Sequence, residues 1–207
     1  MYTEETNMYQ RDHIFLKKWL TILFWLIIPS TIAGFMTQES VAASAPGLYS
    51  FGQILKTLSA LAYSAILLVL AKAHQNYRVA GACGIIVSIL NYVSSLLAVP
   101  FLTVVFSILI IILGLAGEYQ EYTAHAQVVA PWDSVLAEKW YTLWKWYIGS
   151  MIAALASIVL MLIIPLLGAL ATIVSVIAAA VVSIIKLVYL YRTGRAINCP
   201  VEEALPY

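Results

Sequence analysis

The sequence predicts an all-α polytopic membrane protein in which six transmembrane helices are arranged as three hairpins. Composition is the first reason, because 63% of the 207 residues are hydrophobic and 10% are charged, against about 25% charged residues in soluble domains. The second reason is the presence of six stretches without Asp, Glu, Lys, Arg or His, each close to the ~20 residues that cross a ~30 Å bilayer core as a helix. The third reason is an internal similarity between the first and third hairpins, described below. We therefore expect one transmembrane helical domain over residues 1–207.

The six uncharged stretches define the expected spans. The second stretch is short, but Lys56 and Lys72 can extend their ammonium groups to the interface from its two ends. Only Pro100 separates the third stretch from the fourth, and only Pro165 separates the fifth from the sixth. Each of these pairs covers about 40 residues, or roughly 60 Å of helix, so each must form a tight hairpin that crosses twice. The spans are 19–36, 57–71, 79–99, 101–117, 146–164 and 166–185.

The segments around the first three spans are expected to be short connections. Residues 1–13 are polar and form a cytoplasmic arm. Pro29 lies near the middle of the first span, where the missing backbone donor should kink the helix. Residues 37–51 are rich in Ser and Ala and include Pro46–Gly47, a turn signal, so we expect an outer loop there.

Residues 118–145 are expected to form a cytoplasmic elbow between the fourth and fifth spans. Apolar and aromatic residues keep a helical period beyond residue 117, which predicts an amphipathic extension of the fourth helix. The extension should stop around Pro131, and Asp133 or Ser134 can then cap the next helix. After the last span, residues 192–207 are expected to form a cytoplasmic tail.

The distribution of charge predicts that both termini lie in the cytoplasm, because Lys and Arg in short loops are retained on that side of a membrane. Only Lys56 falls on the opposite face. Five of the six tryptophans lie at the basic boundary, where aromatic belts form; they are Trp19, Trp132, Trp140, Trp144 and Trp146. Ten of the eleven basic residues lie on one side, namely Arg11, Lys17, Lys18, Lys72, Arg78, Lys139, Lys145, Lys186, Arg192 and Arg195. We expect a bacterial cytoplasmic membrane protein.

The same features exclude several classes of protein. The net charge of +1 and the absence of a long basic run argue against nucleic acid as a partner. Cys83 lies inside the third span and Cys199 in the tail, so we expect free thiols. The expected partner is the lipid bilayer, with other membrane-protein subunits or self-association as further candidates.

Two motifs near the start of the chain recur near its end. Lys18–Trp19 and the residues after it match the segment that begins with Lys139–Trp140, with six identities in sixteen positions. Lys72-x4-Tyr77-Arg78 matches Lys186-x4-Tyr191-Arg192. A shift of four spans preserves direction through the membrane, so the repeat is parallel and differs from the inverted repeats of many transporters. Whether the middle hairpin is a third copy stays open. The alternative is that any cytoplasmic helix end collects Lys and Trp.

Three residues after the fourth span have a spacing compatible with a metal site. Glu118, Glu121 and His125 lie at i, i+3 and i+7, which places two carboxylates and an imidazole on one helical stripe. Helix bundles that hold metal centres need comparable ligands from facing helices, and only His74 is available from a neighbouring loop. We therefore interpret the stripe as a solvated interfacial face, and we expect no metal and no cofactor.

Basic residues at the cytoplasmic ends of the spans are candidates for binding lipid phosphates or an acidic partner. The alternative is the positive-inside pattern that every polytopic protein shows. The residues are Lys72, Arg78, Lys186, Arg192 and Arg195.

Polar residues inside the spans are the candidates for a ligand site. Asn91 is the most demanding, because an unpaired amide in hydrocarbon costs several kcal/mol. With Tyr92, Tyr63 and Ser64 it provides a small set of polar groups for a ligand. The alternative is interhelical hydrogen bonding at about 1 kcal/mol for each pair.

The spans contain no ionisable side chain, which argues against proton coupling and against hydrolytic catalysis. We therefore expect a non-enzymatic protein that binds or passes a neutral or lipophilic small molecule, for example as the membrane subunit of a transport system. The alternative is an accessory or scaffold protein that associates with other membrane proteins. A polar cavity that reaches Asn91 would favour the first function, and a solid bundle with an exposed apolar groove would favour the second.

Overall fold

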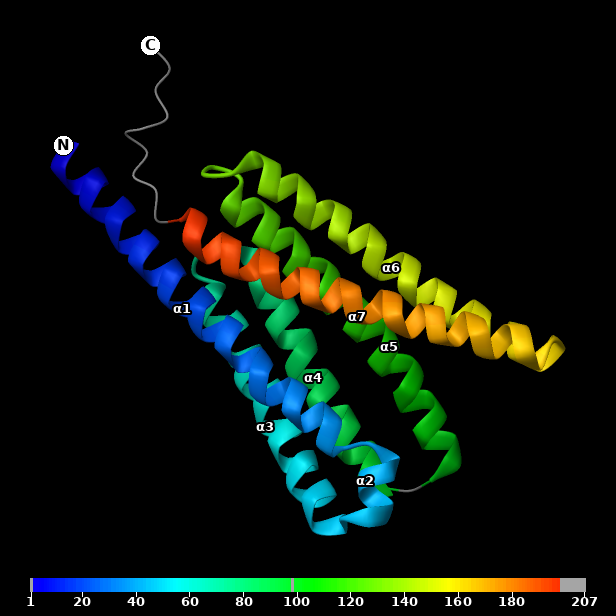
Figure 1. Ribbon diagram of the computed structural model, residues 1–207. Helices are drawn as coiled ribbons and strands as arrows, with labels where there is room; N and C mark the ends of the chain where they lie inside the picture. Colours follow the sequence, from blue (N-terminus) through cyan, green and yellow to red (C-terminus); the bar gives the residue numbers. More distant parts are fainter. Residues whose placement is uncertain (1, 98, 198–207) are drawn as a thin grey trace. The chain divides into compact units, whose positions relative to one another are not determined.

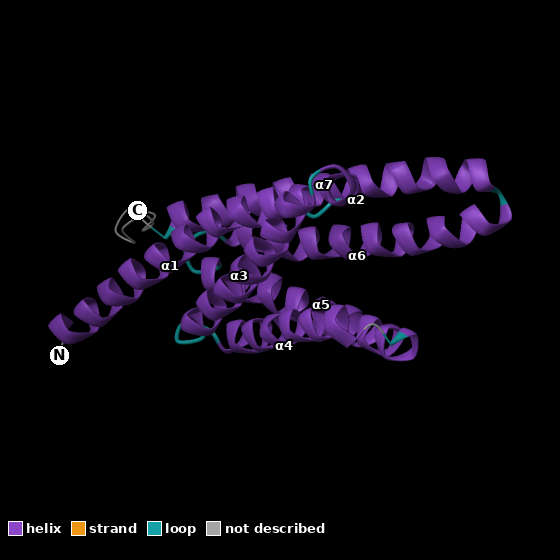
Figure 2. Cartoon of the chain, turned by 90° about the horizontal axis from the view of Figure 1, so that it is seen from below, coloured by secondary structure: helices purple, strands orange, loops and turns teal. Residues whose placement is uncertain are grey.

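The computed structural model describes residues 2–97 and 99–197, except for the side chains of residues 2–12, 95–97 and 100. Its described part is helical throughout, with short turns between helices (Figure 1 and Figure 2). Both cysteines were predicted to be free thiols. Cys83 is a buried free thiol, and Cys199 lies outside the described residues. The helices are α1 Tyr2–Met36, α2 Glu39–Ser44, α3 Pro46–Leu70, α4 Gln75–Leu97, α5 Pro100–Val129, α6 Ser134–Ile163 and α7 Pro165–Ala196.

Six of these helices are long and apolar enough to cross a membrane, which confirms the number of spans predicted from the sequence. The chain thus has the architecture of an integral membrane protein whose apolar helices contact lipid. Most helices continue beyond the uncharged stretches. For example, α6 begins twelve residues before Trp146, and α7 ends eleven residues after Ile185. Charged residues are good helix formers at the interface, so the first charge ends the uncharged stretch but does not end the helix.

The chain divides into two compact units, residues 1–124 and 125–207. In the first unit α3 packs against α1 and α4. A Cβ at Gly52 would lie 2.6 Å from the Cβ of Met36, so the start of α3 lies against the end of α1. A Cβ at Gly81 would lie 2.8 Å from the carbonyl oxygen of Ser64, and one at Gly84 would collide with the Ser64 hydroxyl. Small residues on α4 therefore permit a close approach to α3.

In the second unit α6 and α7 lie side by side and run antiparallel (Figure 1 and Figure 2). Near the turn between them, a Cβ at Gly168 would collide with the backbone of Met161. Farther along, the Thr172 hydroxyl donates a hydrogen bond to the Ser157 hydroxyl, with an O–O distance of 3.1 Å. These contacts fix the register of the two helices, and the glycine is needed where the backbones approach.

The helical extension expected after residue 117 is present, whereas the cytoplasmic elbow over residues 118–145 stays a prediction. The fourth span continues as helix to Val129, and α6 begins directly after Asp133. The Asp133 carboxylate accepts a hydrogen bond from the backbone N–H of Leu136 at 2.8 Å, so Asp133 is the N-cap of α6.

The predicted outer loop over residues 37–51 is wrong for most of its length. The segment holds α2, and α3 begins already at Pro46. Proline is favourable in the first turn of a helix, because its missing N–H would have no partner there. Ser44 and Ser50 donate to carbonyl oxygens one turn earlier, so these hydroxyls are satisfied within helical segments. A proline–glycine pair that indicates a turn in isolation is here the start of a long helix.

The internal repeat and the arrangement as three hairpins stay predictions. Trp19 is half-buried and its ring centroid lies 6.3 Å from that of Phe15, whereas Trp140 is fully buried. Lys72 lies in the turn between α3 and α4 and Tyr77 lies in the first turn of α4, whereas the matching residues of the second motif both lie inside α7. The two copies of each motif thus have different surroundings.

Candidate functional site

The first unit contains a buried carboxylate that is held by three helices. Glu121 on α5 is 3% exposed, and its Oε1 accepts a hydrogen bond of 2.5 Å from the Tyr63 hydroxyl on α3. Tyr77 on α4 is fully buried and interacts electrostatically with the same carboxylate. We call Tyr63, Tyr77 and Glu121 the carboxylate cluster. Burial of a carboxylate is costly unless hydrogen bonds replace its water, which the Tyr63 hydroxyl does in part.

Small residues bring the three helices of the carboxylate cluster together. Gly117 lies one turn before Glu121, and a Cβ at that position would lie 3.1 Å from the Cβ of Cys83 on α4. Ser64, directly after Tyr63, lies against Gly84 of α4. Because the helix backbones lie close together at these small residues, the larger side chains of Tyr63 and Glu121 can contact each other.

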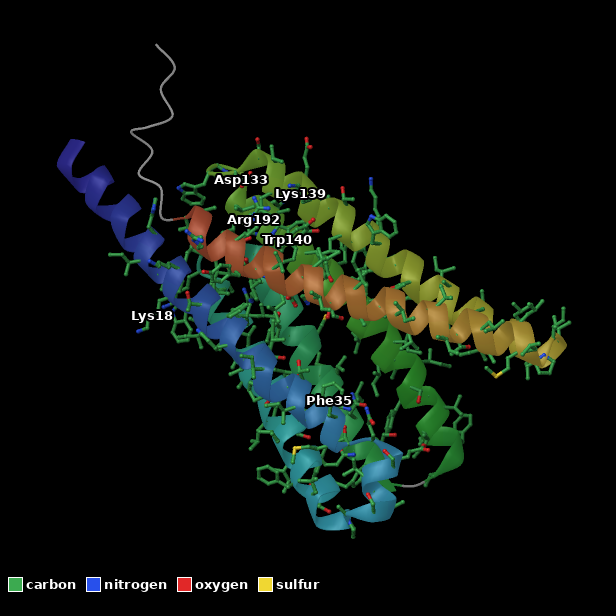
Figure 3. All side chains as sticks on the ribbon, viewed as in Figure 1. Lys18, Phe35, Asp133, Lys139, Trp140 and Arg192 are labelled. Carbon is green, nitrogen blue, oxygen red and sulfur yellow. The ribbon has the colours of Figure 1, made fainter. Side chains whose placement is uncertain are left out.

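The second unit contains a buried aromatic cluster. The indole N–H of Trp140 on α6 donates to the Thr193 hydroxyl on α7 at 3.0 Å. The ring of His125 at the end of α5 stacks on Trp140 with centroids 4.7 Å apart, and Tyr189 meets Trp140 edge-on at 5.8 Å. His125, Trp140 and Thr193 are all fully buried. We call His125, Trp140, Tyr189 and Thr193 the aromatic cluster, and Figure 3 shows Trp140 within the packed end of α6 and α7.

These clusters correct two interpretations of the sequence. The stripe of Glu118, Glu121 and His125 was predicted to be solvated, but Glu121 and His125 are buried and Glu118 is half-buried. Trp140 was predicted to lie in an interfacial aromatic belt, but it is buried in the aromatic cluster. The physical reason is the same in both cases, because each helix continues beyond its uncharged stretch and packs its inner face there against other helices.

Among the described residues, no other helix completes the metal-site spacing on α5. Glu121 bonds to Tyr63 and His125 stacks on Trp140. In the part of the chain that the structure describes, no group of three His, Cys, Asp or Glu residues could hold a metal ion. His74 lies in the turn before α4, and its Nδ1 accepts from the backbone N–H of Asn76 at 3.2 Å.

The four predicted ligand residues fall at two different places. Tyr63 belongs to the carboxylate cluster, and the Ser64 hydroxyl donates to the carbonyl oxygen of Ala60 at 2.8 Å. Asn91 and Tyr92 are exposed on α4. Gly84 of α4 lies opposite Ser64. Asn91 is seven residues farther along α4, so it lies about 10 Å from Gly84 along the helix axis.

The five basic candidates are divided between the two units. Lys72 and Arg78 flank the start of α4 in the first unit, and both are exposed. Lys186 is half-buried on α7, whereas Arg192 and Arg195 are exposed near the end of that helix. The guanidinium of Arg195 lies 6.0 Å from the centroid of the Tyr191 ring, within the range of a cation–π contact.

Sequence reasoning missed the hydrogen bond between Trp140 and Thr193 and the role of Tyr77. Trp140 and Thr193, and likewise Tyr77 and Glu121, lie far apart in the sequence, so no local spacing indicates that they interact. The only signal was the i, i+4 relation of Glu121 and His125, which places both on one face of α5.

The chain matches no protein-family model, no curated protein and no solved structure. Its function must therefore be argued from the arrangement of its own residues.

Proposed function

We propose that the chain is a non-enzymatic integral membrane protein that binds or passes a small neutral or lipophilic molecule through its first unit. We propose the membrane subunit of a transport system as the role that such binding serves. The observation that carries this proposal is the position of Asn91, an amide that is exposed deep in a predicted span.

Asn91 is exposed, and it lies on the continuation of the side of α4 that contacts another helix at Gly84. Gly84, seven residues earlier, contacts α3, and Cys83 contacts α5 at Gly117. Two turns of helix separate Gly84 from Asn91, so Asn91 continues the same side of α4 to within about 20°. Its position is twelve residues into the expected span, or roughly 18 Å, which is near the middle of a ~30 Å hydrocarbon layer.

The Asn91 amide retains hydrogen-bonding capacity. Its Nδ2 donates to the carbonyl oxygen of Val87 in the preceding turn at 2.9 Å. An Asn side chain has a second N–H and a carbonyl oxygen. Apolar binding sites typically use a few such polar groups to orient a ligand. A neutral molecule with one polar group is therefore the class of ligand that this position fits.

The hydroxyl groups in the spans support a non-enzymatic role. Ser88 and Ser107 donate to carbonyl oxygens one turn earlier in their own helices, at 2.8 Å in each case. Ser175 does the same at 2.9 Å. A serine nucleophile instead needs an adjacent base. The hydroxyls thus serve the backbone of their own helices.

We further propose that both termini lie in the cytoplasm of a bacterium. The contact between Met36 and Gly52 shows that α1 and α3 run antiparallel, so Lys18 and Lys72 lie at one end of the first unit. In the second unit the antiparallel α6 and α7 place Lys139 and Arg192 at one end as well. Basic residues at the ends of spans favour the cytoplasmic side.

Retention of a ligand tests the binding function. We would purify the wild type and Asn91→Leu in a mild detergent and record native mass spectra for co-purified neutral molecules. The proposal expects a retained adduct in the wild type that is lost in Asn91→Leu and partly kept in Asn91→Gln, which preserves the amide. Ser107→Ala is the matched control, because it removes another polar group from a span. An adduct that survives Asn91→Leu would contradict the proposal.

A second candidate function is that of an accessory protein that associates with other membrane proteins. The hairpin of α6 and α7 favours it, since its uncharged part exposes large apolar side chains on several sides. Leu162 is 83% exposed, Leu166 74% and Val174 66%. Photo-crosslinking from position 174 in intact membranes distinguishes the two functions, because an accessory protein should give one discrete protein adduct and a lipid-surrounded hairpin should not.

A further inference from the structure

Two basic residues directly precede the partners of the hydrogen bond that joins α6 to α7. Lys139 directly precedes Trp140 on α6, and Arg192 directly precedes Thr193 on α7. The two helices run antiparallel and are therefore related by an approximate twofold axis that passes through the Trp140–Thr193 bond. This axis exchanges the residue before Trp140 with the residue before Thr193, so Lys139 and Arg192 lie on the same side of the helix pair. Figure 3 shows both residues at the same end of the hairpin. We call Lys139 and Arg192 the basic pair.

The two side chains can reach a common anion. The positions of Lys139 and Arg192 differ by about 3 Å along the helix axes, and packed helices are 8–10 Å apart. Both residues are turned about 100° from the helix contact and so project to the same side. A lysine and an arginine with ~6 Å side chains can therefore converge on one phosphate from two helices. Arg192 is exposed and Lys139 is half-buried.

Within the described residues the basic pair has no acidic partner. Asp133 is engaged at the N-terminus of α6, where it accepts from Leu136. Glu138 is exposed and precedes Lys139 directly, and adjacent residues on a helix do not face each other. The basic pair is thus a local concentration of positive charge that an anion would stabilise.

The depth of the basic pair fits the headgroup region of a bilayer. Lys139 lies seven residues before the uncharged part of α6, and Arg192 lies seven residues after that of α7. The backbone at both positions is therefore about 10 Å outside the hydrocarbon, just beyond headgroup layers that are ~5–8 Å thick on each side. Side chains on a helix lean toward its N-terminus, so Arg192 leans toward the membrane and Lys139 leans away from it. The long Arg192 side chain thus reaches into the headgroup layer, and the Lys139 ammonium approaches the phosphate from its water side. We propose that the basic pair binds the phosphate of an anionic phospholipid headgroup.

The test uses the full-length protein in nanodiscs of phosphatidylcholine with added phosphatidylglycerol. Native mass spectrometry reports how much phosphatidylglycerol each variant retains. A basic residue near an anionic surface contributes an attraction equivalent to about fivefold in affinity, so each of Lys139→Gln and Arg192→Gln should lower retention about fivefold. The double variant should lower it about thirtyfold, and Lys139→Arg should retain the lipid.

The matched control is the double variant Lys145→Gln with Lys17→Gln, which also removes two basic residues next to spans. It should retain phosphatidylglycerol as the wild type does. An equal loss in this control would overturn the proposal, because any basic residue would then suffice. Unchanged retention in the Lys139→Gln and Arg192→Gln double variant would also overturn it. Displacement of the lipid by millimolar inorganic phosphate would identify a free-phosphate site and overturn the lipid assignment. Circular dichroism confirms that each variant keeps its helical content.

Discussion

At the scale of single residues, polar groups are buried where the helices extend past the uncharged stretches. Glu121 accepts a side-chain hydrogen bond from another helix, and Trp140 donates one to another helix. Such bonds matter because a buried polar group that loses its partner retains the full cost of its lost hydration. Substitutions that remove one partner should therefore be more damaging than their size suggests.

Tyr63→Phe removes the hydroxyl that donates to Glu121. Because a hydrogen bond to a carboxylate contributes about 1.5–3 kcal/mol, we expect a loss of stability of that order. Thermal unfolding in detergent measures it, with Tyr49→Phe as the control, since the Tyr49 hydroxyl has only an exposed bond from Gln53 on its own helix. Equal effects of both substitutions would contradict a buried role for the carboxylate cluster.

Trp140→Phe removes the indole N–H and leaves Thr193 without its donor. We expect destabilisation by about 2–4 kcal/mol, from the lost hydrogen bond together with lost core volume. Trp146→Phe is the matched control, because Trp146 is 67% exposed and should change stability little. The same melting experiment compares them, and a similar melting temperature for both variants would show that the aromatic cluster is not a core.

At the scale of helices, stability depends on positions where backbones approach closely. At Gly84 an added methyl group would collide with the Ser64 hydroxyl, whereas at Gly114 it would meet no atom within 4 Å. The same substitution at these two glycines should therefore have opposite effects.

Gly84→Ala is expected to destabilise the packing of α3 on α4 by about 1–3 kcal/mol, because the extra methyl overpacks the contact. Gly114→Ala, also within a helix, should stabilise by up to ~1 kcal/mol through its higher helix propensity. Thermal melting of the two variants in the same detergent checks the sign of each change. A neutral Gly84→Ala would show that the helices separate easily.

Asp133→Ala tests the start of α6. The carboxylate caps the backbone N–H of Leu136, and loss of an N-cap typically costs about 1 kcal/mol. Hydrogen exchange of the first turn of α6 should accelerate, while Ser134→Ala should leave it close to the wild-type rate. Unchanged exchange in Asp133→Ala would contradict the capping role.

At the scale of the whole molecule, the distribution of basic residues predicts the orientation in the membrane. Single cysteines at position 56 and at position 134, in a background where Cys83 and Cys199 are replaced by Ala, should react from opposite sides with a membrane-impermeant maleimide. We expect labelling from outside at position 56 and only after permeabilisation at position 134, because position 134 lies on the face where ten of the eleven basic residues are expected. The reverse pattern would overturn the proposed orientation.

The sequence by itself determined the number of spans, the helical extension after residue 117 and the capping of α6, because these depend on charge, period and local hydrogen bonds. It did not determine where Glu121, His125 and Trp140 lie, since a helical stripe at the bilayer edge has the same composition whether it faces water or another helix. Nor did it identify Lys139 and Arg192 as neighbours. Only the tertiary structure decided these points, because burial and pairing depend on which helices pack together, and residues such as Trp140 and Thr193 are 53 positions apart in the chain.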